Sequence, residues 1–90
     1  EENVAALREI RARFPEATIR LVQVPDKYES AAGRYTLDVA KILEGTRIEY
    51  FSVLARCPLS QGQYYARDNH PNAEGYRKLA SCVSTYLGLG

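Results

Sequence analysis

Residues 17–24, ATIRLVQV, constrain the fold of this chain more than any other stretch. The run is short and rich in β-branched residues, which predicts a strand. Ile19 and Leu21 would lie on one face of that strand, with Val22 and Val24 on the other. A strand that is apolar on both faces is typical of a parallel sheet covered by helices. The first expectation is therefore an α/β layer.

The remaining patterns alternate between helix and strand. The predicted order is a helix over 4–14, the strand 17–24, a short helical turn over 28–32, a helix over 37–44, a strand over 48–54, a loop over 55–69 and a helix over 73–87. This alternation favours parallel strands joined by right-handed crossovers. Because two strands are too few for a satisfactory sheet, the fold class predicted is a partial three-layer α/β/α arrangement with an incomplete sheet. The missing strands would come from a preceding segment or from a second copy of the chain.

The two longest predicted helices each have a face expected to be buried. The apolar positions of the first helix are Val4, Leu7, Ile10 and Phe14, and those of the last are Tyr76, Leu79, Ala80, Val83 and Leu87. Asn72 is the predicted N-cap of the last helix, and Gly88 is its predicted C-terminal residue. Thr36 is the predicted N-cap of the helix over 37–44.

Length and charge exclude several classes of protein. Ninety residues form one domain at most, or a fragment of one. The net charge is +1 with both signs interspersed, so no nucleic-acid footprint is present and no apolar run is long enough to span a membrane. Cys57 and Cys82 do not form a zinc motif, and their spacing alone does not distinguish a disulfide from two buried thiols. The compartment stays open.

The chemistry of the chain is concentrated in residues 67–76, RDNHPNAEGY, which hold the only histidine. In an extended loop, residues two apart point to the same side with α-carbons about 6.5 Å apart, so the Asp68 carboxylate can reach Nδ1 of His70. That contact would leave Nε2 free to accept a proton from a nucleophile. Pro71 and Asn72 would hold the histidine at the start of a helix.

The same residues allow other interpretations. HPN is also an ordinary start of a helix, with Asp68 as a solvated loop acid. A metal site made of Asp68, His70 and Glu74 is a further alternative, although these ligands fit no established spacing. Tyr64 and Tyr65 would line a substrate or cover the core, and Arg67 would steer a substrate or form a solvated pair with the aspartate.

Residues 64–87, YYARDNHPNAEGYRKLASCVSTYL, closely resemble the last conserved block of the SGNH, or GDSL-type, hydrolases. VAALREIRARFPEATIRLVQVPDKYES and EGTRIEYFSVL resemble the segments that precede this block. The resemblance implies a three-layer α/β/α fold, with His70 as general base and Asp68 as the acid that orients it. It also implies acyl-ester chemistry, often on carbohydrates, with no cofactor, and it slightly favours an extracytoplasmic location.

Two features depart from that family pattern. One residue separates Asp68 from His70 where many members have two, a spacing that resembles the branch associated with polysaccharide O-acetylation. The nucleophile and oxyanion blocks are absent, and all five serines are interpreted as structural because none is predicted on a sharp strand-to-helix turn: Ser30, Ser52, Ser60, Ser81 and Ser84. The hypothesis is therefore the base-bearing C-terminal part of an ester hydrolase or O-acyltransferase, inactive in isolation, with its serine upstream. The alternative is a non-catalytic α/β interaction module that associates through open strand edges.

Overall fold

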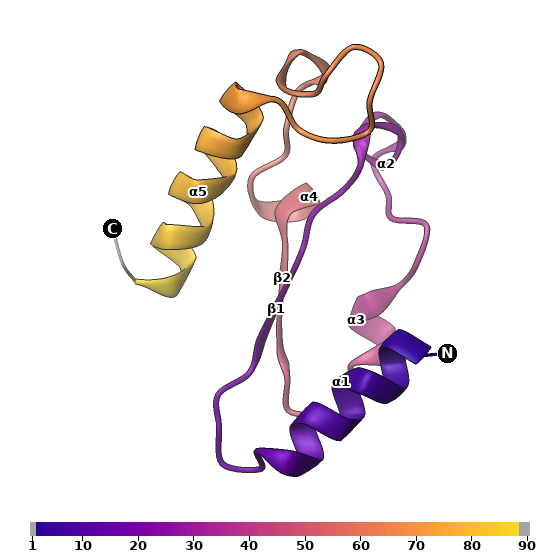
Figure 1. The fold of residues 1–90 in the computed structure, drawn as a ribbon, viewed down its shortest axis with the longest axis vertical. Helices are drawn as coiled ribbons and strands as arrows, with labels where there is room; N and C mark the ends of the chain where they lie inside the picture. The colour runs from indigo at the N-terminus through magenta and orange to yellow at the C-terminus, as the bar shows by residue number, and fades with distance from the viewer. Residues whose placement is uncertain (1, 89–90) are drawn as a thin grey trace.

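A computed structural model describes residues 2–88 of the chain (Figure 1). Its elements follow the order α1 (Glu2–Arg13), β1 (Arg20–Gln23), α2 (Lys27–Ala32), α3 (Val39–Ile42), β2 (Glu49–Ser52), α4 (Val53–Arg56), the 3-10 turn η1 (Gln61–Gln63) and α5 (Ala73–Leu87). None of these helices is long and apolar enough to cross a bilayer within the described residues.

The two strands pair in parallel, in a register that runs from Arg20 opposite Glu49 to Gln23 opposite Ser52. The first pair of this register is also an ion pair, with Arg20 Nε donating to Glu49 Oε2 at 2.8 Å. Helices α2 and α3 lie in the connection between the strands. The predicted fold class is thus confirmed as a mixed α/β structure with an incomplete parallel sheet.

The carboxyl ends of both strands lie at the same end of the molecule. Figure 1 shows α2, α4 and the loop before α5 gathered there, while α1 crosses the opposite end and α5 runs alongside. In open α/β sheets, side chains that act on ligands collect at the carboxyl ends of the strands. The loop that carries His70 is therefore at the end of the sheet where such side chains are expected.

The core lies between the end of β2 and helix α5. It consists of Phe51, Val53, Leu59, Tyr64 and Leu79, with Val22, Cys57, Cys82 and Tyr86 packed against it. The rings of Phe51 and Tyr86 are 4.2 Å apart between centroids. Cys57 and Cys82 form a disulfide that joins α5 to the segment after α4, which settles the alternative that the spacing left open.

The predicted buried faces are only partly correct. Ile10 on α1 and Phe14, which directly follows the helix, are 45% and 59% exposed, whereas Leu7 on the same predicted face is half-buried. On α5, Leu79 is buried as expected, but Tyr76 is 52% exposed. Helix α5 is rotated so that Cys82 and Tyr86, rather than the predicted Ala80 and Leu87, face the core.

The predicted ends of the last helix are confirmed. Asn72 Oδ1 accepts a hydrogen bond from Gly75 N at 3.0 Å, and Gly88 ends α5 in a left-handed conformation with φ 78°. The cap of α3 is Asp38 and not Thr36, because Asp38 Oδ1 accepts a hydrogen bond from Lys41 N at 3.2 Å.

The second predicted strand is too long at its carboxyl end. Strand pairing stops at Ser52, and the Ser52 hydroxyl accepts a hydrogen bond from Ala55 N at 3.1 Å to begin α4. Residues 53 and 54 are therefore helical, and the long loop predicted over 55–69 is shortened by α4 and interrupted by η1.

Candidate active site

The loop 65–70 is closed at its base by backbone hydrogen bonds. Tyr64 and Pro71 form an isolated antiparallel bridge, and Tyr65 N donates to His70 O at 3.1 Å. Asn72 N donates to Gln63 O at 2.8 Å, directly below the bridge. The two ends of the loop, including the backbone of His70, are therefore held together.

Asn72 joins this base to helix α5. Its Oδ1 caps the helix, while its Nδ2 donates to Gly62 O at 2.8 Å and to Tyr64 O at 3.3 Å. Pro71 is buried and fixes one backbone angle between His70 and the cap. The HPN sequence is thus a helix start, as the simpler interpretation states, and it also fixes the position of the histidine backbone.

The Tyr64 side chain joins the base of the loop to the segment that follows β1. Its hydroxyl donates to Pro25 O at 2.9 Å, and the side chain is only 3% exposed. Burial raises the pKa of this phenol, so Tyr64 stays a neutral donor over the physiological range. Of the two roles open to Tyr64, the structure shows the core role.

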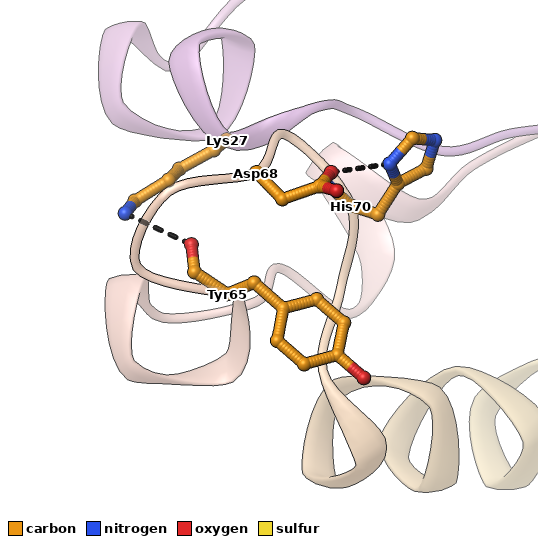
Figure 2. A network of polar contacts seen from close by, with 4 residues as sticks. All are labelled: Lys27, Tyr65, Asp68 and His70. Atoms are coloured by element: carbon orange, nitrogen blue, oxygen red, sulfur yellow. Dashed lines mark hydrogen bonds and ion pairs between the residues drawn. The ribbon is translucent and has the colours of Figure 1, made fainter.

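The structure brings Asp68 and His70 together as the sequence predicts. Asp68 Oδ1 accepts a hydrogen bond from the backbone amide of His70 at 2.9 Å and also contacts the imidazole Nδ1 (Figure 2). The His70 amide, and then its imidazole, lowers the pKa of the Asp68 carboxyl, which therefore stays ionised near neutrality. One carboxylate thus fixes both the backbone and the ring of the histidine.

This contact decides which imidazole nitrogen is available for chemistry. A carboxylate at Nδ1 requires the proton on that nitrogen, which leaves the lone pair of Nε2 as the acceptor. The His70 side chain is 73% exposed, and Nε2 has no hydrogen-bond partner among residues 2–88. The pair can therefore act as an oriented base toward a group that approaches from solvent or from another segment.

A cavity of about 520 Å³ opens beside the imidazole. Its lining is mainly apolar and comes from the end of β1, the start of α2, the loop and the first turns of α5: Val24, Pro25, Asp26, Glu29, Asn69, His70, Pro71, Tyr76 and Leu79. The sequence did not predict Val24 or Tyr76 as site residues, since both belong to stripes assigned to the core. Only the structure shows that Val24 and Tyr76 are 41% and 52% exposed, so that they are accessible at the cavity.

The two other predicted site residues do not join the pair. Figure 2 shows the Tyr65 ring pointing away from the imidazole, and its side chain is 52% exposed. Arg67 is exposed and forms no ion pair within the described residues, so the solvated pair with Asp68 is not formed. Neither residue lines the cavity beside His70.

None of the five serines lines this cavity either. Ser52 does join a strand to a helix, β2 to α4, but not on the sharp turn that exposes a nucleophile. Its backbone is in an ordinary extended conformation, with φ −97°, and its hydroxyl caps α4 and shares a hydrogen bond with Tyr35 Oη at 3.1 Å. Ser52 is therefore a capping residue, and the structural interpretation of the serines stands.

Metal binding by Asp68, His70 and Glu74 receives no support from the geometry. Across residues 2–88, no three His, Cys, Asp or Glu side chains are arranged so that they could hold an ion. Glu74 lies in the first turn of α5, where its charge favours the helix N-terminus.

Comparison with protein-family models, with curated proteins and with solved structures gave no match for this chain.

Proposed function

We propose that this chain is the C-terminal part of an SGNH-type ester hydrolase or O-acyltransferase domain, in which His70 is the general base and Asp68 orients it. The observation that supports the proposal most is the contact of the Asp68 carboxylate with Nδ1, on a histidine whose Nε2 is exposed beside a cavity. The resemblance of residues 64–87 to the last block of that family supports the same assignment.

In the proposed reaction, Nε2 of His70 takes the proton from a serine hydroxyl as its oxygen attacks the ester carbonyl. Asp68 stabilises the imidazolium that forms, and the imidazolium then returns the proton to the departing alcohol. A water or an acceptor hydroxyl, deprotonated by the same nitrogen, releases the acyl group from the serine. The serine and the oxyanion donors belong to a segment outside these 90 residues.

The chain alone is expected to be inactive, because it would hold the base and its orienting acid but neither the nucleophile nor the oxyanion donors. A single oxyanion donor lowers the activation barrier by about 3 to 4 kcal/mol, and the nucleophile forms the covalent intermediate. The proposed substrate is a small-molecule or carbohydrate acyl ester. The Cys57–Cys82 disulfide supports an oxidising compartment, where such bonds persist.

The experiment is hydrolysis of a short-chain aryl ester by the complete protein that carries the nucleophile. His70→Ala is expected to lower kcat by at least about a hundredfold, because it removes the general base. Glu74→Gln is the matched control, since it changes a charge in the same segment without touching the pair. Wild-type rates in His70→Ala, or the absence of a GDS-like serine and a GxN-like segment upstream, would contradict the proposal.

The second candidate is a non-catalytic interaction module, and the exposure of Ile10, Phe14 and Val24 favours it. These apolar side chains and the unpaired edges of a two-stranded sheet could be covered by a second copy of the chain. Size-exclusion chromatography separates the candidates, because a stable dimer in a protein without upstream catalytic segments would support the module.

A further inference from the structure

We infer that Lys27 is a positioning residue for the Asp68–His70 pair, acting through the backbone of the loop 65–70. The inference rests on the proposed function for its catalytic consequence, whereas its structural part stands on the contacts alone. Lys27 was not predicted as a site residue, and no pattern in the sequence links it to a loop 38 residues away.

Three hydrogen bonds join Lys27 to the loop. Its Nζ donates to Tyr65 O and to Ala66 O, both at 3.2 Å, and its backbone N donates to Asn69 O, also at 3.2 Å. The ammonium therefore holds the first arm of the loop, while the amide holds the second arm between Asp68 and His70. Figure 2 shows Lys27 reaching the loop on the side away from the imidazole.

The backbone bond has its origin in helix α2. Lys27 is the first residue of that helix, so its amide has no partner inside the helix and is free to bind a carbonyl. Asp26 and Glu29 close a capping box around the same turn, which fixes the direction of that amide. Gln61 Nε2 donates to Lys27 O at 3.4 Å, so the carbonyl group of Lys27 is also held by a hydrogen bond.

The loop has little else to hold it in place between its two ends. Every side chain from residue 65 to residue 70 is exposed, so no apolar burial fixes its course. Segments with few buried contacts open most easily, and here the bonds to Lys27 add to the Asp68–His70 contact as the restraints beyond the base. A change in the loop would move Asp68 relative to His70, and small displacements of catalytic groups cost up to about a hundredfold in rate.

Lys27 acts by geometry and not by neutralising the acid. It makes no ion pair with Asp68 or with another carboxylate of residues 2–88. Its partners are carbonyl oxygens, which a guanidinium can also reach. Lys27→Arg should therefore preserve the function, and Lys27→Met, which keeps the aliphatic stem and the backbone amide but removes the Nζ donors, should not.

The first test is nuclear magnetic resonance on the full chain, labelled with ¹⁵N. His70 is the only histidine, so its ring nitrogens report directly on which of them carries the proton. Lys27→Met removes the Nζ bonds to Tyr65 O and Ala66 O and keeps the backbone bond to Asn69 O, so the order parameters of the Ala66 and Arg67 amides should fall from about 0.85 to below about 0.6. The ring should also lose its preference for the proton on Nδ1.

Lys78→Met is the matched control, because Lys78 Nζ also donates to a backbone carbonyl, that of Pro58, away from the loop. It should leave both signals unchanged, and Lys27→Arg should restore them. Unchanged order and ring signals in folded Lys27→Met would overturn the inference. If that variant does not fold, Lys27→Gln replaces it, and unchanged signals in Lys27→Gln would overturn the inference equally.

The second test measures ester hydrolysis by the complete protein. Lys27→Met should lower kcat by about tenfold or more with little change in KM, and Lys27→Arg should recover it. A loosened loop with wild-type kcat would overturn the catalytic role of Lys27. A wild-type protein without esterase activity would instead refute the proposed function, while the spectroscopic test still decides whether Lys27 positions the pair.

Discussion

The disulfide between Cys57 and Cys82 allows a quantitative test of how helix α5 is held. It joins residues separated by 25 positions, with α-carbons 6.4 Å apart, and it packs against the core next to Phe51 and Tyr86. The perturbation is reduction of the bond in the otherwise unchanged protein, so that no side-chain volume is lost. Replacement of both cysteines by serine provides an independent version of the same change.

The expected effect follows from the length of the closed loop. For a separation of 25 residues, restriction of the unfolded chain contributes about 3.5 kcal/mol to stability at 25 °C. A chain of 90 residues has a total free energy of unfolding of roughly 5 to 13 kcal/mol. Reduction should therefore remove a large share of the stability, and α5 should be the first element to detach.

The assay is urea unfolding followed by circular dichroism, with and without a thiol-free reductant, at equal protein concentration. Hydrogen exchange of the α5 amides, compared with those of β1 and β2, shows whether the helix opens separately. A stability difference below about 1 kcal/mol between the two forms would refute the reasoning. Equal exchange in α5 and the strands would show that the bond does not dock the helix specifically.

Two further predictions concern the core and the response to acid. Gly75→Ala would place a Cβ against a backbone carbonyl of η1, so it should lower the free energy of unfolding in urea by about 1 to 3 kcal/mol. Gly62→Ala is the control, because a Cβ there would meet no atom within 4 Å, and it should change the free energy of unfolding by under about 0.5 kcal/mol. Burial raises the pKa of Glu29, but the amides of Thr36 and Asp26 lower it more, so the net pKa lies below its ordinary value of 4.5. The stability that Glu29 contributes is then present above pH 4.5 and is lost as the pH falls through the lower pKa of the folded state. The free energy of unfolding, measured in urea at pH 6 and pH 3, should therefore differ more in wild type than in Glu29→Gln. Parallel pH profiles of the two proteins would contradict this prediction.

Local signals in the sequence predicted the parts of the fold that depend on neighbouring residues. The Asn72 cap and the Gly88 end of α5 are confirmed, because a cap needs only the amides of its own first turn. The contact of Asp68 with His70 is confirmed for the same reason, since two residues in a tight loop need no distant partner. The order of the two strands and of α1, α2, α3 and α5 followed from helical periodicity and from runs of β-branched residues.

Features set by distant contacts could not be predicted in this way. The rotation of α5 is fixed by the Cys82 bond and by the stacking of Tyr86 on Phe51, neither of which leaves a trace in helical periodicity. Helix α4 was missed because its apolar start continues the strand pattern, and only the Ser52 cap ends the strand. The contacts of Lys27 lie across 38 residues and involve backbone carbonyls, which no side-chain pattern encodes.

The shape of the molecule has a consequence for its heat capacity. The extents are 40 × 32 × 18 Å, and the accessible surface is 6281 Å², about 1,000 Å² above the value expected for a compact chain of this mass. Unfolding therefore exposes less additional surface than in a compact chain, and the heat-capacity change should be smaller than the usual value of about 12 to 15 cal/mol/K per residue. Calorimetry should show a small heat-capacity step, a broad melting transition and a stability curve that is nearly flat with temperature.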